Sequence, residues 1–195
     1  MSKGEATRGA ILDVAVATAY RVGLGGLTIG ELARTADMSK SGLYAHFRSK
    51  EALQLAVLDA ARRRFVDRVV RPALATPRGE ARLRELVDRW LAAGLSREPG
   101  CSLFVKASTE LDEQEGPVRD ALTADHRDLL DTIAQVFRTC VAEGDVAEDA
   151  DPDQFATDLD GIMLAFYHAH RLLRDPDAEL RARRAFENLL AAARP

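Results

Sequence analysis

TIGELARTADMSKSGLYAHF, residues 28–47, is the stretch that decides the fold of this 195-residue sequence. It opens in the form of a capping box, in which Thr28 is followed three residues later by a glutamate, and predicts a helix through about Thr35. Ser39 is suited to cap a second helix that runs through about His46. Two short helices joined by a tight turn form a helix-turn-helix, which presents the N-terminal end of its second helix to the major groove of DNA.

Helical spacing of apolar residues continues on both sides of this stretch, and strand-like alternation is nearly absent. A first helix is predicted to end at Gly23, Gly25 and Gly26, and a fourth to run from Ser49 to just before Pro72. The remaining predicted helices run from Thr76–Pro77 to about Leu95, from Cys101 to Leu111, onward from Pro117, from Pro152 to about Leu173, and across Leu180 to Leu190. The sequence therefore predicts an all-α protein of about nine helices and no sheet.

The composition is that of a globular protein with a buried core. Hydrophobic residues make up 47% and charged residues 30% of the chain, which fits a protein that buries a core. The 7 prolines and 13 glycines are too few and too scattered for a disordered or collagen-like chain. No apolar run approaches the roughly 18 residues that a membrane span needs, and no signal-peptide pattern opens the sequence. The two cysteines, Cys101 and Cys140, are too few for a disulfide framework. We therefore expect a cytoplasmic protein with free thiols and no membrane partner.

The net charge of −4 is distributed unevenly along the chain. Residues 1–73 carry 12 Lys and Arg against 7 Asp and Glu, whereas residues 74–195 carry 15 against 24. A basic N-terminal third on an acidic remainder suggests that one end of the protein meets an anion, although charge runs are more often only solvated faces.

The side chains around the second helix of the predicted helix-turn-helix are suited to contact with DNA. The residues at its tip are short or flexible, so the backbone there can approach base edges closely. These residues are Ser39, Lys40, Ser41 and Gly42. Hydroxyl, imidazole and ammonium donors suited to phosphate oxygens lie on the flanks. They belong to Tyr44, His46 and Lys50.

One pattern joins residues across this region and the helix that follows it: Thr28, Leu32, Ala33, Ala36, Ser39, Leu43, Tyr44, His46, Phe47, Ser49, Lys50, Glu51 and Leu53. The pattern resembles the DNA-binding domain of TetR-family transcriptional regulators, over residues 6–71. Its long tail, Leu-Tyr-x-His-Phe-x-x-Lys, makes it one of the more specific helix-turn-helix patterns. Asp37 departs from it, since such proteins usually have glycine in the turn. Aspartate tolerates left-handed backbone geometry better than most residues, so we expect a normal turn.

The resemblance implies roles for individual residues. Thr28 and the amides after it, together with Tyr44, His46 and Lys50, would hold backbone phosphates. The residues expected to face bases are Lys40, Ser41, Gly42 and Ala45. Arg48 is a further phosphate candidate, with a solvated surface arginine as its alternative. A half-buried core position is the alternative for Tyr44.

The resemblance also implies a division of the chain. Residues 1–50 would form the helix-turn-helix domain, with a connecting helix over residues 50–71. Residues 72–195 resemble the family's ligand-binding and dimerisation domain in helix order and length, without a comparable motif.

Large apolar and aromatic residues with occasional polar tips recur through the acidic part of the chain. A pocket lined in this way binds a small apolar or aromatic molecule with one polar group, although a hydrophobic core is the alternative for each residue taken singly. The candidate pocket residues are Trp90, Phe104, His126, Phe137, Met163, Phe166 and Tyr167.

No constellation in the sequence favours catalysis, a cofactor or a metal. Aspartates alternate around Pro152 like the start of a calcium loop, but a helix begins there, so we favour helix capping by Asp151. The acidic cluster from Glu110 to Glu115 is explained by a helix end and a solvated loop. His126 has no Cys or Glu at zinc spacing.

The leading hypothesis is a sequence-specific DNA-binding regulator, a repressor that leaves its operator when a small molecule binds. Its last two helices carry more apolar residues than one core requires, and would pair around a two-fold axis in a homodimer, as in the resembling family. The residues concerned are Ile162, Met163, Leu164, Phe166, Tyr167, Phe186, Leu189 and Leu190. Such a dimer would read a palindromic operator with recognition helices about 34–36 Å apart or a little more. The alternatives are an all-helical ligand carrier or enzyme that merely contains a helix-turn-helix, and an architectural DNA-binding protein without a ligand.

Overall fold

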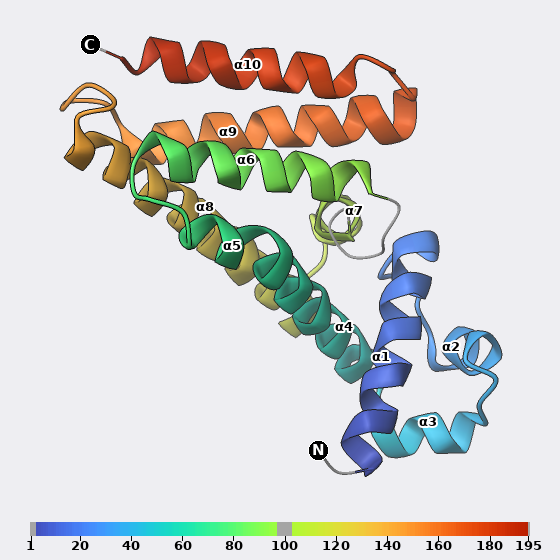
Figure 1. Cartoon of the computed structure of the whole chain (residues 1–195). Helices are drawn as coiled ribbons and strands as arrows, with labels where there is room; N and C mark the ends of the chain where they lie inside the picture. The colour runs from blue at the N-terminus through green and yellow to red at the C-terminus, as the bar shows by residue number, and fades with distance from the viewer. Residues whose placement is uncertain (1–2, 97–102, 195) are drawn as a thin grey trace. The chain divides into compact units, whose positions relative to one another are not determined.

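The computed structural model describes residues 3–96 and 103–194, with side chains from residue 7 onward. Over these residues the regular structure is entirely helical and forms nine continuous segments, which confirms the predicted fold class (Figure 1). The elements are α1 Lys3–Val22, α2 Ile29–Thr35, α3 Lys40–His46, α4 Lys50–Phe65, the π-helical η1 Val66–Val70, α5 Arg71–Leu74, α6 Glu80–Leu95, α7 Leu103–Leu111, α8 Pro117–Glu143, α9 Pro152–Tyr167, the π-helical η2 His168–Leu173 and α10 Ala178–Ala192. None of the described helices is both long and apolar enough to cross a membrane.

The fourth helix does not end before Pro72, contrary to the sequence prediction. α4 continues through η1 into α5, and Pro72 lies in the first turn of α5. The change from π-helical to α-helical hydrogen bonding restarts the ladder at Arg71. A proline is tolerated in a first turn because its missing N–H has no obligatory partner there.

The helix predicted to start at Thr76–Pro77 begins at Glu80 instead. Gly79 precedes it with φ 86°, a left-handed conformation that favours glycine. The Glu80 N–H donates to the Asp145 carboxylate at 2.6 Å, and the Gly79 N–H donates to the Thr139 hydroxyl at 3.0 Å. These capping partners lie more than fifty residues away in the sequence, so no local signal marks this helix start.

The chain forms two compact units, which we describe separately. Unit 1 comprises residues 1–65 and 98–125, and unit 2 comprises residues 66–97 and 126–195. The helix α7 therefore groups with the N-terminal helices, although it follows α6 of unit 2 in the sequence. The functional division into residues 1–50, 50–71 and 72–195 stays a prediction, because this grouping describes packing alone.

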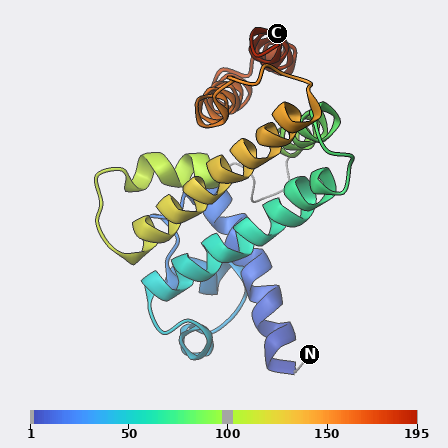
Figure 2. The ribbon, with the colours of Figure 1, turned by 90° about the vertical axis from the view of Figure 1, so that its left-hand side faces the viewer.

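Unit 1 has one apolar core, to which α1, α2, α3, α4, α7 and the first turns of α8 contribute. Leu32 of α2 and Leu43 of α3 are buried in this core, and so is Phe47. From α7, Leu103, Ala107 and Leu111 enter the same core. Figure 2 shows α7 beside the beginning of α8, after the chain has reversed through residues 112–116.

In unit 2, α9 and α10 run side by side and α6 lies along them (Figure 1). Its core contains a stacked aromatic pair, Phe137 and Phe155, with 3.9 Å between the ring centroids. A Cβ on Gly94 would lie 2.5 Å from the Phe166 ring, so glycine is what allows α6 and α9 to approach. Charged pairs add a second layer between α6 and α10, Arg84–Glu187 and Asp88–Arg183, and Glu80 of α6 also pairs with Arg194, just after α10.

Candidate DNA-binding surface

The turn between α2 and α3 has the geometry that the helix-turn-helix pattern predicts. Asp37 adopts φ 51°, in the left-handed region that aspartate tolerates, so its presence in place of glycine leaves a normal turn. The Met38 N–H then donates to the Ala33 carbonyl at 3.0 Å, which closes the end of α2. Leu32 and Leu43 are fully buried on the inner faces of the two helices, and their burial fixes which face of α3 points outward.

Each of the two short helices has its predicted N-cap. The Thr28 hydroxyl accepts from the Glu31 N–H at 3.0 Å, and the Ser39 hydroxyl accepts from the Gly42 N–H at 3.1 Å. The reciprocal half of the capping box is missing, because the Glu31 carboxylate pairs with Arg34 at 2.7 Å. The hydrogen bond from Arg34 lowers the pKa of Glu31 from its ordinary value.

The residues predicted to face bases lie on the outer surface of α3. Lys40, Ser41 and Ala45 are exposed, and Gly42 is half-buried next to the N-cap. A Cβ on Gly42 would lie 3.1 Å from the Ser39 hydroxyl oxygen, so glycine leaves room for the cap. The tip of α3 therefore combines a free surface, a flexible cation and a closely approachable backbone.

The predicted phosphate contacts differ in their surroundings. Tyr44 is 53% exposed, which disfavours the alternative of a core aromatic. His46 is half-buried, with its ring 6.4 Å from that of Phe47, and Arg48 is exposed. The Lys50 ammonium donates to the Gly25 carbonyl at 2.7 Å, a partner that the sequence did not reveal. An ammonium has three donors, so this bond leaves Lys50 able to contact a phosphate as well.

Sequence reasoning missed a further cation beside α3. The guanidinium of Arg8, on α1, lies over the ring of Phe47 at 5.4 Å from its centroid. Stacking on a buried ring orders the arginine without neutralising its charge. The two residues are far apart in the sequence, so nothing local signalled this contact.

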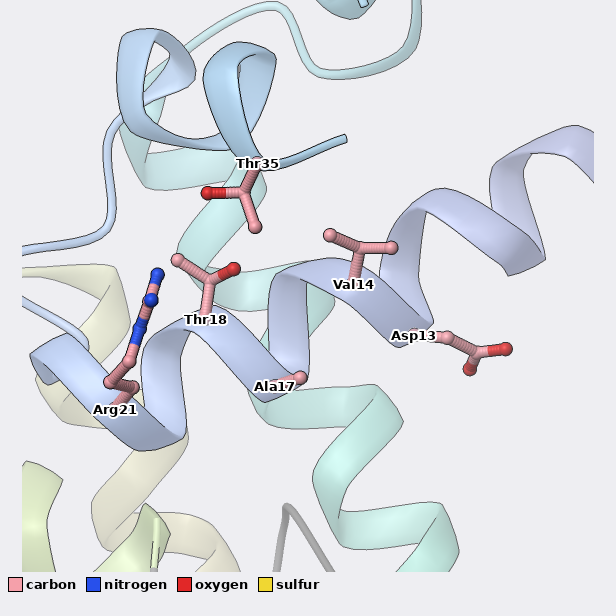
Figure 3. A pocket seen from close by; sticks show the side chains of 6 residues that line it. All are labelled: Asp13, Val14, Ala17, Thr18, Arg21 and Thr35. Atoms are coloured by element: carbon pink, nitrogen blue, oxygen red, sulfur yellow. The ribbon is translucent and has the colours of Figure 1, made fainter. Parts of the chain in front are cut away.

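A hollow of about 530 Å³ lies on unit 1 between α1 and α2 (Figure 3). It is lined by Asp13, Val14, Ala17, Thr18, Arg21 and Thr35. Its charged groups are engaged elsewhere, since Asp13 pairs with Arg64 and Arg21 pairs with Glu31. None of the predicted ligand-pocket residues lines this hollow.

The predicted ligand-pocket residues divide between the two units. Phe104 belongs to unit 1 and packs against its core. In unit 2, His126 is half-buried and the others are buried: Trp90, Phe137, Met163, Phe166 and Tyr167. Asp160 of α9 is half-buried near His126, and burial raises its pKa while the His126 charge acts in the opposite direction. Burial also raises the pKa of the Cys140 thiol to about 12, so this thiol is unreactive. Cys101 lies outside the described residues.

Two acidic clusters have different outcomes. Asp151 caps α9, because its carboxylate accepts from the Asp153 and Gln154 N–H groups, and this confirms the capping interpretation. Glu110 is not simply solvated, as the sequence had suggested, since its carboxylate accepts from the Gly25 N–H at 2.7 Å. Across the described residues, no group of His, Cys, Asp and Glu side chains is arranged to hold a metal ion.

An all-helical protein with an exposed, capped helix in a helix-turn-helix falls in the class of helical DNA-binding proteins. Residues 11–57 match the family model for bacterial regulatory proteins of the tetR family, and residues 79–186 match the model for the tetracyclin repressor-like C-terminal domain. The chain belongs to the TetR family of bacterial transcriptional regulators.

Individual relatives agree with this assignment. An uncharacterized HTH-type transcriptional regulator in the dhlA 5′ region of Xanthobacter autotrophicus is 31% identical over 127 residues, which span 64% of this chain and 62% of that protein. A TetR-family regulator from Streptomyces coelicolor shares the fold with a TM-score of 0.82 at 24% identity, over 96% of this chain and 90% of that one. A TetR-family regulator from Cytophaga hutchinsonii gives 0.86 at 15% identity, over 100% and 98%. AibR, in complex with isovaleryl coenzyme A and operator DNA, gives 0.74 at 21% identity, over 96% and 98%.

Proposed function

We propose that this regulator is a homodimeric repressor that binds a palindromic operator through α3 and leaves it when a small molecule binds in unit 2. The observation that carries the DNA-binding part is the exposed N-terminal half of α3, capped by Ser39 and anchored by the fully buried Leu43. A helix held in this way presents its tip to a major groove with little conformational freedom left to lose.

The contacts divide by the information they carry. Lys40, Ser41, Gly42 and Ala45 face base edges and select the sequence of the operator. A second group holds phosphates and sets the docking register without selecting sequence: Thr28, Tyr44, His46 and Lys50. Arg8 and Arg48 add positive charge on the same unit, which favours approach to DNA of any sequence.

The homodimer is proposed to form through α9 and its continuation η2. The apolar residues first considered for this role include Met163, Phe166 and Tyr167, which unit 2 buries within a single chain. A different face is exposed, with helical spacing and small or apolar side chains in most positions. We call it the α9 stripe; it consists of Gly161, Leu164, Ala165, His168 and Leu172. A face of small residues lets a symmetry-related helix approach closely around a two-fold axis.

The effector is proposed to be a small apolar or aromatic molecule with one polar group. It would bind among the six predicted pocket residues of unit 2: Trp90, His126, Phe137, Met163, Phe166 and Tyr167. AibR has the same fold and was crystallised with isovaleryl coenzyme A, which joins a short apolar group to a polar carrier. Release from DNA requires that the effector bind the DNA-incompetent form more tightly than the competent one, since equal affinity shifts no equilibrium.

Gel-shift and fluorescence-anisotropy titrations with the DNA flanking the gene for this chain test the proposal. We expect binding in the nanomolar range at moderate salt, competed poorly by unrelated duplex, and reversed by an apolar effector. Lys40→Ala should change the preference at one operator base pair by about 1–3 kcal/mol. Equal affinity for all duplexes without effector release would favour an architectural protein, and the absence of DNA binding would favour a ligand carrier or an enzyme.

A further inference from the structure

The loop between α1 and α2, residues 23–27, is held by side chains from two other helices of unit 1. The Gly25 N–H donates to the Glu110 carboxylate of α7 at 2.7 Å. The carbonyl of the same residue accepts from the Lys50 ammonium, at the start of α4, at 2.7 Å. Gln54 of α4, itself buried, donates to the Leu24 carbonyl at 2.8 Å. The N–H and the carbonyl of Gly25, which belong to two successive peptide groups, are therefore both bonded to charged side chains.

The helix α7 is well placed to act as the support for this loop. Its apolar face, with Leu103, Ala107 and Leu111, is buried in the core of unit 1. Lys106 precedes Glu110 by one helical turn and donates to the Tyr20 carbonyl of α1 at 2.9 Å. The same face of α7 thus bonds to the end of α1 and to the loop that follows it.

Glycine in the loop is what lets the carboxylate reach the backbone. Gly23 adopts φ 85°, and a Cβ there would collide with the Glu110 carboxylate. A Cβ on Gly25 would lie 3.4 Å from one oxygen of the same carboxylate. These glycines were expected only to end the first helix. They also form the space that Glu110 fills.

The loop leads directly into the DNA-binding helices. Leu24 and Leu27 are fully buried, so the loop is a fixed part of unit 1. The next residue, Thr28, is the N-cap of α2 and a predicted phosphate contact. A displacement of the Gly25 peptide would therefore be passed to Thr28 and α2, and to α3 through the tight turn at Asp37.

We propose that Glu110 is a positioning residue for DNA recognition: its carboxylate holds the α1–α2 loop against α7 and so sets α2 and α3, without touching DNA. This inference rests on the proposed DNA-binding function. It predicts whether removing this carboxylate raises or lowers the affinity for DNA. Removing a carboxylate from a DNA-binding protein should tighten binding if only long-range electrostatics matter, whereas loss of the positioning bond should weaken it.

The test compares three variants of the full-length chain: Glu110→Ala, Glu110→Gln and Glu115→Ala. The glutamine keeps an oxygen acceptor for the Gly25 N–H, whereas alanine removes it. Glu115→Ala removes the same charge from an exposed position in the same acidic cluster. Hydrogen exchange in the DNA-free protein should be about tenfold faster at the Gly25 amide in Glu110→Ala, a few-fold faster in Glu110→Gln and unchanged in Glu115→Ala.

Affinity for the flanking-gene DNA is then measured at several salt concentrations. We expect Glu110→Ala to bind about tenfold more weakly with the wild-type salt slope, because no phosphate contact is lost. Glu110→Gln should recover most of the affinity, and Glu115→Ala should bind as tightly as the wild type or more tightly. If Glu110→Ala does not fold, the test rests on Glu110→Gln. In that variant, faster exchange at the Gly25 amide must be accompanied by weaker DNA binding.

Two results would overturn the proposal. One is a Glu110 variant with faster Gly25 exchange but wild-type or tighter DNA affinity; the other is a salt slope reduced by about one, which would make Glu110 part of a phosphate-binding arrangement. Failure of the wild type to bind the flanking DNA would instead refute the proposed function. In that case the exchange rates still report separately whether Glu110 holds the loop.

Discussion

Unit 1 and unit 2 are stabilised in different ways. In unit 1, small polar groups accept from backbone N–H groups three residues further on, as in the caps of Thr28 and Ser39. In unit 2, aromatic rings stack within the core, and ion pairs such as Arg84–Glu187 join α6 to α10 across a hundred residues of sequence. The helix-turn-helix surface is therefore specified mostly by one contiguous segment of the sequence. The fold of unit 2 depends instead on contacts between segments that are far apart in the sequence.

The largest expected effect is a loss of operator affinity, a property of unit 1, caused by a substitution in unit 2. Leu164→Arg places a charge in the α9 stripe and should convert the proposed dimer to monomers. Each monomer reaches only one half-site, so operator affinity should fall by at least about a hundredfold. Sedimentation equilibrium and anisotropy measure the two effects.

The control for this prediction is Leu74→Arg. Leu74 is exposed to a similar extent, 45% against 39% for Leu164, but lies on α5. We expect this variant to remain a dimer with wild-type DNA affinity. A Leu164→Arg protein that stays dimeric would move the interface away from the α9 stripe.

The next effect contrasts two helical glycines, one in each unit. Gly94→Ala introduces a Cβ against the rings of Phe166 and Tyr167, and should lower the free energy of unfolding by about 1–3 kcal/mol through overpacking. Gly9→Ala, on the exposed face of α1, meets nothing within 4 Å and should raise it by up to about 1 kcal/mol. Urea unfolding measures both. If the two substitutions changed the free energy of unfolding equally, α6 and α9 would have room to separate around the added methyl group.

A smaller effect distinguishes two cations of unit 1. Lys50→Ala should reduce the salt slope of DNA binding by about one and weaken affinity about tenfold at moderate salt. It also loses its bond to the Gly25 carbonyl, so part of the defect should persist at high salt, where phosphate contacts contribute least. Arg48→Ala should reduce the slope alone. A wild-type slope in Lys50→Ala would assign Lys50 wholly to the loop.

The smallest effect concerns Asp160 in unit 2, whose pKa is raised by burial. Folding therefore favours the protonated carboxyl, so its contribution to stability is full at low pH and is lost as the pH rises through the raised pKa. Asp160→Asn should accordingly raise the free energy of unfolding at pH 7 by about 1 kcal/mol and have little effect below about pH 4. Urea unfolding at both pH values measures this. Asp158→Asn, at an exposed position on the same helix, is the control, and a gain confined to low pH would contradict the assignment.

The sequence by itself determined the elements whose signals are local. Caps act within three residues and apolar stripes within a few turns, so the bounds of α2 and α3, the helical class and the exposed tip at Ser39 to Ser41 followed from spacing. Left-handed geometry at Asp37 followed from the properties of that residue alone. Such features need no knowledge of what lies elsewhere in the chain.

The tertiary structure decided whatever depends on a partner far away in the sequence. The start of α6 at Glu80 depends on Asp145, the burial of Met163, Phe166 and Tyr167 within one chain leaves a different face of α9 exposed, and Pro72 fits because η1 precedes it. The role of Glu110 is the clearest case, because a carboxylate in an acidic cluster looks solvated until α7 is packed against the loop at Gly25. Hydrogen bonds and packing act over a few ångströms in space. The separation of two residues along the chain does not indicate whether folding brings them that close.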